Sequence, residues 1–429
     1  MRALDLSTRL TDLGHSGRRS IYLLLLPVLF LLGLFLLSTF VLFKIGVGVW
    51  GINIPVAWGF AIVNFVWWVG IGHAGTFISA ILLLMRQSWR SSVNRLAESM
   101  TLFAVACAGL FPLLHMGRPW YFYWLLPYPN DMDLFPQYRS PLVWDAFAVM
   151  TYATISLVFW FVGMIPDFAE AREKTASKGK AILFGILSFG WSGTAGEWAS
   201  YKRVTWLLAL IATPLVISVH SIVSLDFAVA KLPGWHSPFF PPYFVSGAIY
   251  SGFAMVIVIL LWVKKTFEVN DLITEEHLEK CARYLLISGT FLTYCYGMEF
   301  FTIWFGEEHF ELRSLRFEAL GPKAYVFWAM IFCNIASLQL LWFKKLRRNH
   351  RVLFAVSLLV LIGMWMERYV IVVTTLADTF LPAMEGSYRG TRWDWGLFLG
   401  TLGVFGFGML VVLRFLPFIP ITEIKEERE

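Results

Sequence analysis

Charged side chains are scarce in this 429-residue chain: Asp, Glu, Lys and Arg make up 15% of the residues, whereas 58% are hydrophobic. An ordinary soluble domain carries about 25% charged residues, so the composition excludes that class of protein. The first apolar run, residues 21–43, is longer than the roughly 7–15-residue core of a signal peptide and lacks a small-residue cleavage motif. The sequence therefore predicts an integral membrane protein that retains this first segment.

Cysteines and cofactor motifs are also few. The four cysteines lie in or beside apolar runs without CxxC spacing: Cys107, Cys281, Cys295 and Cys333. The sequence contains no CxxCH motif, no Gly-rich phosphate loop after a strand and no cysteine cluster suited to iron and sulfur. We therefore expect the cysteines to fill the core, and we expect no iron–sulfur cluster and no metal ion in this chain.

A b-type haem needs two axial ligands that face each other at one depth. Counting residues along the apolar runs places His73, His115 and His220 at three different levels. We therefore expect no haem in this chain, and any electrons must come from or go to another subunit.

About ten apolar stretches of roughly 20 residues are each long enough to cross a bilayer. They are residues 20–43, 56–85, 97–117, 141–165, 204–230, 243–263, 283–306, 324–343, 352–374 and 395–416. The predicted fold class is therefore all-α, a polytopic membrane protein with residues 1–429 forming one integral membrane domain. No internal repeat stands out.

Positive charge is distributed unevenly between the two sides of these stretches. The side that holds the N-terminus carries 25 Lys and Arg residues and the other side 9, with Arg368 alone inside a span. The positive-inside rule places both termini in the cytoplasm. No basic stripe interleaves with exposed aromatics, so we expect no nucleic-acid partner. The composition of the inner loop 166–203 is typical of a solvated linker, and that of the outer loops 119–140 and 231–242 is typical of compact caps.

Three titratable residues fall at one level near the outer face. His115 ends the third span, Asp145 lies in the first turns of the fourth, and Asp226 lies near the end of the fifth. Each taken singly could snorkel to the interface or cap a helix end. For Asp145, the positive end of the helix dipole would stabilise the carboxylate there. Their shared depth favours a common site. Trp144 and Tyr152, with Trp120 and Tyr121, could line this site or belong to an interfacial aromatic belt.

Other polar residues lie deeper in the apolar stretches, where an unpaired charge costs several kcal/mol. These candidates for a proton path are His73, Glu98, His220, Glu299, Glu367 and Arg368. The structural alternatives are a hydrogen-bonded core histidine for His73, whose glycine neighbours indicate close helix packing, and a buried ion pair for Glu367 and Arg368. Because adjacent residues point about 100° apart on a helix, each of these two should also find a partner on a neighbouring span.

The chain resembles the NrfD-like, polysulfide-reductase-type membrane subunits, and most closely the quinol-binding subunit of alternative complex III. The resemblance covers roughly residues 50–375 and is carried by these segments: NFVWWVGIGHAGTFISAIL, CAGLFPLLHMGRPW, SPLVWDAFA, TPLVISVHSIVSLDFAVAKLPGWHSPFFPPYFVSGAIYSGFAMV and GMWMERYVIVV. It implies ten transmembrane helices, with residues 56–230 and 243–374 forming two four-helix bundles and the first and last helices at the periphery. It also implies a quinol pocket near the outer face of the first bundle.

The family's quinol-site histidine and aspartates match His115, Asp145 and Asp226. The resemblance implies quinol oxidation near the outer face of the bacterial cytoplasmic membrane, with menaquinone favoured over ubiquinone. It further implies an extracytoplasmic iron–sulfur partner, c-type cytochrome subunits and a paralogous NrfD-like membrane subunit. Two alternatives stay open: a passive membrane anchor for an electron-transfer complex, and a proton or ion transporter that uses the deeper polar residues.

Overall fold

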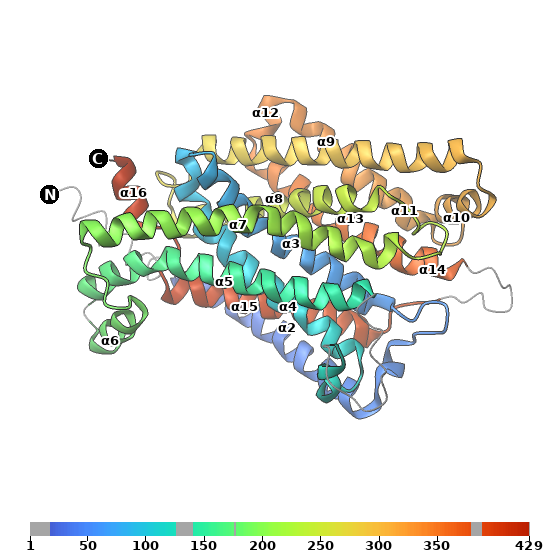
Figure 1. Cartoon of the computed structure of the whole chain (residues 1–429), viewed down its shortest axis with the longest axis horizontal. Helices are drawn as coiled ribbons and strands as arrows, with labels where there is room; N and C mark the ends of the chain where they lie inside the picture. The colour runs from blue at the N-terminus through green and yellow to red at the C-terminus, as the bar shows by residue number, and fades with distance from the viewer. Residues whose placement is uncertain (1–17, 126–139, 176, 379–387, 429) are drawn as a thin grey trace.

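The computed structural model describes residues 18–125, 140–175, 177–378 and 388–428. In these residues the long helices run side by side with roughly parallel axes (Figure 1). Nine helical stretches of the described part are long and apolar enough to cross a membrane. They are α2 (Arg18–Ile45), α3 (Gly59–Leu84), α4 (Asn94–His115), α5 (Pro141–Lys174), α7 (Ala195–Ala228), α8 (Phe240–Phe267), Ala324–Trp342, which begins with α11 (Ala324–Ile331), His350–Ala377, which begins with α13 (His350–Tyr369), and α15 (Arg392–Phe415).

The tenth expected span, residues 283–306, lies within α9 (Glu275–Gly306). This helix has 32 residues and is long enough to cross a bilayer. It is not among the nine apolar stretches, because Glu, Lys and Arg occupy its first turns and Ser, Thr and Tyr recur farther along. The all-α fold class is confirmed for the described residues, whereas the count of ten spans stays a prediction.

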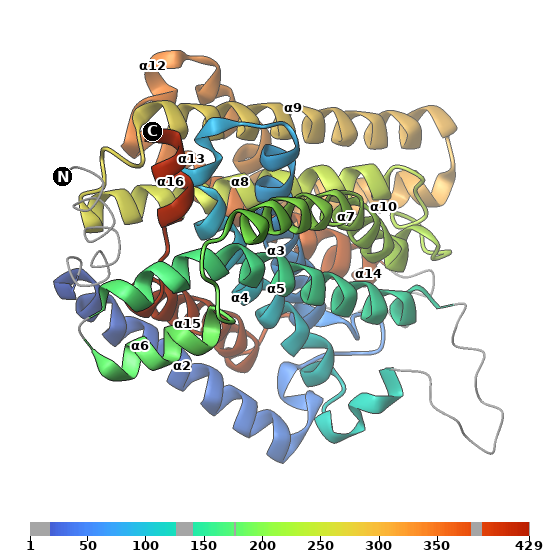
Figure 2. The same cartoon turned by 60° about the vertical axis from the view of Figure 1, so that its left-hand side comes forward.

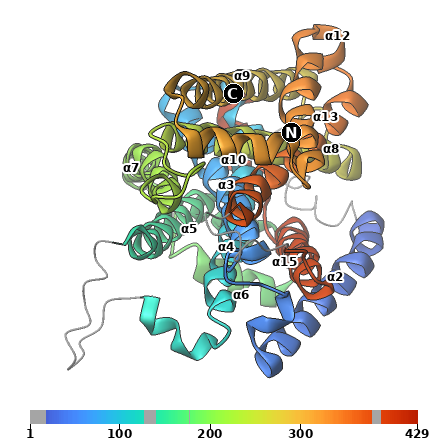
Figure 3. The ribbon, with the colours of Figure 1, turned by 90° about the vertical axis from the view of Figure 1, so that its right-hand side faces the viewer.

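Helix α3 lies at the centre of the molecule, as the view along the helices shows (Figure 3). It contacts α4, α7, α8 and α13. Two glycines permit these close approaches: a Cβ on Gly75 would lie 2.1 Å from the carbonyl oxygen of Ala97, and one on Gly252 would lie 1.8 Å from the Cβ of Ala74. The close packing expected around His73 is therefore confirmed, and small residues let the backbones meet as they do in membrane helix pairs.

The other helices surround α3 in two groups. In the first group α3 contacts α4, α5 and α7, and α5 also contacts α4 and α7; in the second group α8 contacts α9 and α13. Helices α2 and α15 pack against each other at the edge of the molecule (Figure 3). Few residues of α2 are fully buried. One hydrophobic core runs through both groups, because α8 packs on α3 and α7. The division into two bundles at residues 230–243 stays a prediction.

The segment 166–203 is not the solvated linker that its composition indicated. Helix α5 continues to Lys174, α6 covers Lys178–Leu187, and α7 begins at Ala195. Asp167 is fully buried within this segment. The prediction of a linker was wrong because several of the charged side chains cap helices or pair with other chain segments. Glu197, for example, accepts hydrogen bonds from Thr194 at the start of α7.

The helices define two ends of the molecule, named here after one residue at each. The His115 end holds η1 (Val47–Trp50), η3 (Pro119–Leu125), α10 (His309–Leu320) and α14 (Thr375–Ala377). The Arg95 end holds η2 (Ser88–Ser92), α6, α12 (Lys344–Arg347) and α16 (Ile421–Arg428), and both α6 and α16 are visible there in Figure 2. Helix α2 begins at this same end, and α16 also lies there (Figure 1). The orientation of the two ends in a membrane stays a prediction.

Part of the expected cap is present at the His115 end. Within residues 231–242, Trp235 is buried against Trp58 and Phe227, and its indole nitrogen donates to the carbonyl of Ile371 at 2.6 Å. This loop therefore folds back onto the helices. Of the other expected cap, residues 126–139 lie outside the described part of the chain.

Candidate functional site

A cavity of about 420 Å³ lies at the His115 end between α3, α4 and α5. Its wall is apolar except at two titratable side chains, His115 and Asp145. Small-molecule sites in proteins commonly measure about 300–1,000 Å³ and combine apolar walls with a few polar groups. The cavity thus has the size and composition of a site for a largely apolar ligand with a polar head.

His115 is the last residue of α4, and the chain turns immediately afterwards at Gly117, whose φ of +67° suits glycine. The imidazole Nε2 lies 3.2 Å from the carbonyl oxygen of Ala57. A carbonyl can only accept, so Nε2 carries the hydrogen and Nδ1 of the neutral ring is left as the basic nitrogen. The ring also lies 6.0 Å from that of Trp50. His115 is therefore held in one orientation with a proton-accepting nitrogen.

Asp145 and Asp226 differ in their relation to this cavity. Asp145, on α5, lines the cavity and is 5% exposed, and its Oδ1 has no hydrogen-bond partner within the described residues. Asp226, on α7, does not line the cavity, but its carboxyl is close enough to interact electrostatically with that of Asp145. The structure thus brings His115 and Asp145 to one cavity, whereas Asp226 lies outside its wall within electrostatic range of Asp145.

The aromatic residues named from the sequence lie elsewhere. Trp144 is 39% exposed, and Tyr152 is fully buried with its hydroxyl 3.1 Å from the carbonyl oxygens of Gly72 and His73. Neither lines the cavity, whose aromatic wall comes instead from Trp58, Phe65 and Phe122.

Sequence reasoning missed this aromatic wall although a signal was present. Trp58, Ile62 and Phe65 recur with the spacing of one helix face and all line the cavity.

His73 and His220 meet in the core between α3 and α7. Their Nδ1 atoms are 3.0 Å apart, so one ring donates a hydrogen bond to the other, and both Nε2 atoms are buried without a partner among the described residues. The expectation that these two histidines lie at different depths was therefore wrong. Counting along a helix gives depth only if the helices end at one level, and α3 and α7 are offset along their axes.

A series of buried hydroxyls extends from this histidine pair toward the Arg95 end. The ring of His73 lies 4.3 Å from that of Tyr152. Thr76 then donates to Ser156 at 3.1 Å, and its backbone nitrogen donates to Thr101 at 2.8 Å. One turn farther along α3, Ser79 donates to the carboxyl of Glu98 at 2.5 Å. Polar groups thus recur along one face of α3.

Glu98 belongs to a buried charge cluster at the Arg95 end. Arg95 is 2% exposed and lies 3.5 Å from Glu98 and 2.9 Å from Asp167. Asp167 also accepts hydrogen bonds from the backbone nitrogens of Ile421 and Thr422, and so caps α16. Sequence reasoning missed Arg95 and Asp167 because each fell two residues outside an expected span, although Arg95 and Glu98 stand three residues apart on one helix.

The second group of helices holds Glu367 and Arg368, and these two side chains form an ion pair with each other. Each also has a partner on a neighbouring helix, as their angular separation predicted. The hydroxyl of Tyr296 donates to Glu367, and the guanidinium of Arg368 lies 4.3 Å from the centre of the Phe244 ring. Every charge of the pair is therefore matched, as a buried pair requires.

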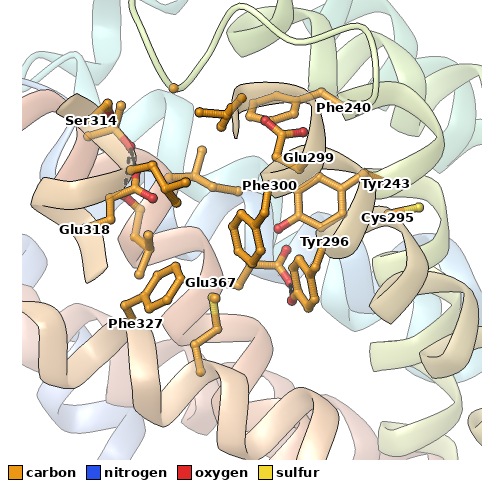
Figure 4. A pocket seen from close by; sticks show the side chains of 17 residues that line it. Phe240, Tyr243, Cys295, Tyr296, Glu299, Phe300, Ser314, Glu318, Phe327 and Glu367 are labelled. Atoms are coloured by element: carbon orange, nitrogen blue, oxygen red, sulfur yellow. Dashed lines mark hydrogen bonds between the residues drawn. The ribbon is translucent and has the colours of Figure 1, made fainter. Parts of the chain in front are cut away.

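A second, smaller cavity of about 60 Å³ lies beside this pair (Figure 4). Glu299, Glu318 and Glu367 approach it from three different elements (Figure 4). Ser237 donates to Glu299 at 2.9 Å and Thr375 donates to Glu318 at 2.7 Å. Burial raises the pKa of Glu318, on α10 outside the membrane spans, to about 8, so this carboxyl is largely protonated at neutral pH. The space suits a few water molecules rather than an organic ligand.

All four cysteines are buried and free, as expected for core residues. Among the described residues no group of three or more His, Cys, Asp or Glu side chains could hold a metal ion.

Comparison with protein families decides what kind of chain this is. The model of the family described as polysulphide reductase, NrfD, matches residues 48–378, which is well over half of the sequence. The chain belongs to the NrfD family. The matched part of this NrfD-family chain runs from η1 to Asp378 and contains both cavities, the histidine pair and the charged pair of α13. Helices α2, α15 and α16 lie outside it.

Two curated proteins resemble this NrfD-family chain over most of their length. A protein of Halobacterium salinarum, named as a putative dimethyl sulfoxide reductase membrane subunit, is 25% identical over 412 residues, which cover 89% of each chain. A selenate reductase subunit of Mesobacillus selenatarsenatis is 20% identical over 373 residues, covering 81% of this chain and 83% of the relative. Both names describe subunits of reductases.

Proposed function

We propose that this NrfD-family chain is the quinol-binding membrane subunit of a respiratory electron-transfer complex. The observation that carries the proposal is the apolar cavity whose only titratable wall residues, within the described part of the chain, are His115 and Asp145. A quinol head group has two hydroxyls that must lose protons as its electrons leave, and its tail is apolar. This ligand chemistry fits the wall composition.

Oxidation of a quinol releases two electrons and two protons and leaves a quinone. His115 receives one proton on Nδ1, because Nε2 is engaged with the carbonyl of Ala57. Asp145 receives the other proton and passes it toward the neighbouring Asp226. The electrons leave to an extracytoplasmic iron–sulfur subunit docked at the His115 end, which the positive-inside rule assigns to the outer face of the bacterial cytoplasmic membrane.

Which respiratory complex contains this subunit is a separate and more specific proposal. The two relatives carry the names of reductase subunits, which favours a complex that delivers quinol electrons to a terminal reductase. The assignment to alternative complex III rests on sequence resemblance alone. The same holds for its c-type cytochrome subunits, its paralogous membrane subunit and menaquinone as the quinone.

Filling the cavity should abolish ligand binding without disturbing the fold. Gly109 lines the cavity, and a Cβ added there would meet nothing within 4 Å. The variant Gly109→Leu puts a bulky side chain into the space, and leucine also favours the helix over glycine. We expect binding of a quinone analogue to the purified complex to weaken by about tenfold or more, which equals about 1.4 kcal/mol. Fluorescence titration with the analogue measures this change.

Gly297→Leu is the matched control, because Gly297 lies in α9 and its added Cβ also meets nothing within 4 Å. This control should bind the analogue as the native complex does. Unchanged binding in Gly109→Leu would refute the cavity as the quinol site and would favour a passive membrane anchor, one of the two alternatives to a quinol subunit.

A proton route through the first group of helices is a second candidate function. It is favoured by the polar series His220, His73, Tyr152, Thr76, Ser156, Ser79 and Glu98. These groups cost free energy at membrane depth, and proton transfer requires a chain of such groups. Because a quinol site at the outer face moves no net charge by itself, the route would have to couple the site to the opposite side.

The ratio of protons to electrons tests this route in sealed vesicles that contain the whole complex. Under the proposal, native vesicles take up protons from the side of the Arg95 end during quinol oxidation. The variant His220→Ala should lower that uptake, whereas Glu367→Gln, in the other group of helices, should leave it unchanged. Quinol oxidation without any proton uptake in the native complex would show that the buried polar residues are structural.

A further inference from the structure

A third cavity, of about 570 Å³, lies at the Arg95 end between the last turn of α8 and the first turns of α13. Its wall has two chemically different parts. Leu261, Trp262 and Phe354 form an apolar part, and a basic part is formed by Lys264, Lys265, His350 and Arg351. Neither the quinol proposal nor the family match assigns a role to this cavity.

Two of the basic groups are fixed and partly neutralised. Lys264 is 6% exposed, and its Nζ lies 2.7 Å from one carboxylate oxygen of Glu275. The imidazole of His350 lies 2.7 Å from the other oxygen of the same carboxylate. One carboxylate of α9 thus holds both side chains in place, so this part of the wall is rigid.

The other two basic groups are not neutralised. Lys265 and Arg351 are exposed and form no ion pair with the described residues. Among the described residues, Glu268 is the only acidic one on the wall. Arg351 also stands in the first turn of α13, which contains no acidic residue, and there the positive end of the helix dipole opposes a cation and favours an anion. The cavity therefore presents uncompensated positive charge.

The depth of the cavity matches a lipid headgroup. Helix α8 is apolar up to Val263 and then reads Lys264–Lys265, so the hydrocarbon region of a membrane must end at this level. Phe354 and Trp262 lie on the membrane side of the basic groups. A soluble anion would need only the cations, whereas a phospholipid would also use the apolar part for its acyl chains.

We propose that this cavity binds one anionic phospholipid, with its phosphate between Lys265 and Arg351 and its acyl chains against Trp262 and Phe354. The lipid joins the ends of α8 and α13 at the membrane surface. The proposal depends on the chain's place in a membrane and does not depend on quinol binding at the opposite end of the molecule.

The test uses the whole complex reconstituted in phosphatidylcholine nanodiscs that contain a minor amount of phosphatidylglycerol. After extraction into mild detergent, native mass spectrometry counts the phosphatidylglycerol molecules that stay bound. We expect the double variant Lys265→Gln/Arg351→Gln to lose one retained phosphatidylglycerol relative to the native complex. The matched control Lys344→Gln/Lys345→Gln removes two exposed positive charges from the neighbouring α12, which does not line the cavity, and should retain it.

Three outcomes would overturn the proposal. Equal loss in both double variants would indicate general attraction to a charged surface. Equal retention of phosphatidylcholine would indicate an apolar groove without headgroup recognition. Displacement of the lipid by millimolar inorganic phosphate would indicate a site for soluble anions. Because Lys265 and Arg351 are exposed, the double variant should fold, and unchanged quinol oxidation would confirm that it does.

Discussion

Replacing His115 with alanine should lower quinol turnover by about 10²–10⁴-fold, the usual effect of removing a general base, while the complex still assembles. The imidazole lines the apolar cavity and is held by the carbonyl of Ala57 at 3.2 Å, which leaves Nδ1 to accept the quinol proton. A single carboxylate accepts only one proton, so Asp145 alone cannot receive both protons of the quinol. Steady-state oxidation of a soluble quinol analogue by the purified complex measures the loss.

His236→Ala provides the matched control for this prediction. His236 also lies at the His115 end, and its Nδ1 lies 3.0 Å from the carbonyl oxygen of Ala230. It does not line the cavity, so its replacement should leave turnover close to that of the native complex. If His115→Ala and His236→Ala are equally active, His115 has no catalytic role. If His115→Ala prevents assembly, the residue acts structurally and the proposed mechanism loses its base.

Much of the fold could be predicted from the sequence. A segment that crosses lipid must form all its backbone hydrogen bonds internally, as a helix does, and must be apolar over about 20 residues. Counting along the spans also put His115, Asp145 and Asp226 at one level, and two of the three, His115 and Asp145, line one cavity. This worked because each residue lies close to a helix end, where a small error in the boundary shifts the depth little.

The same counting failed deeper in the membrane. His73 and His220 were placed at different levels, yet their Nδ1 atoms are 3.0 Å apart. The relative offset of α3 and α7 depends on their packing, which glycines such as Gly75 and Gly252 permit. Hydropathy carries no information about that offset.

The cluster around Arg95 was missed for another physical reason. Hydropathy marks where a helix becomes polar, and that point differs from where the helix ends. Helix α5 continues eight residues past Pro166, so that Asp167 lies in the protein interior instead of a loop. A charged residue just beyond an apolar run can therefore be buried by other segments, here by α16.

Replacing Arg95 with methionine should destabilise the folded chain by about 3–5 kcal/mol, because removal of one partner leaves buried charges uncompensated. Arg95 is 2% exposed and is the cation shared by Glu98 and Asp167, with a further hydrogen bond of 2.8 Å to the carbonyl of Gly163. Asp167 would then stay next to the start of α16 without its counter-charge. Because methionine preserves much of the apolar stem of arginine, the loss of stability reflects the missing charge more than the missing volume.

The four native cysteines provide the measurement for this variant, since all are buried and free. Their reaction with a thiol reagent, in the complex at increasing SDS concentration, should begin at a lower concentration in Arg95→Met than in the native chain. The triple variant Arg95→Met/Glu98→Gln/Asp167→Asn removes every charge of the cluster and should recover most of the loss, because neutral amides need no counter-charge. A triple variant as unstable as the single one would mean that Arg95 stabilises this end by packing and hydrogen bonding alone.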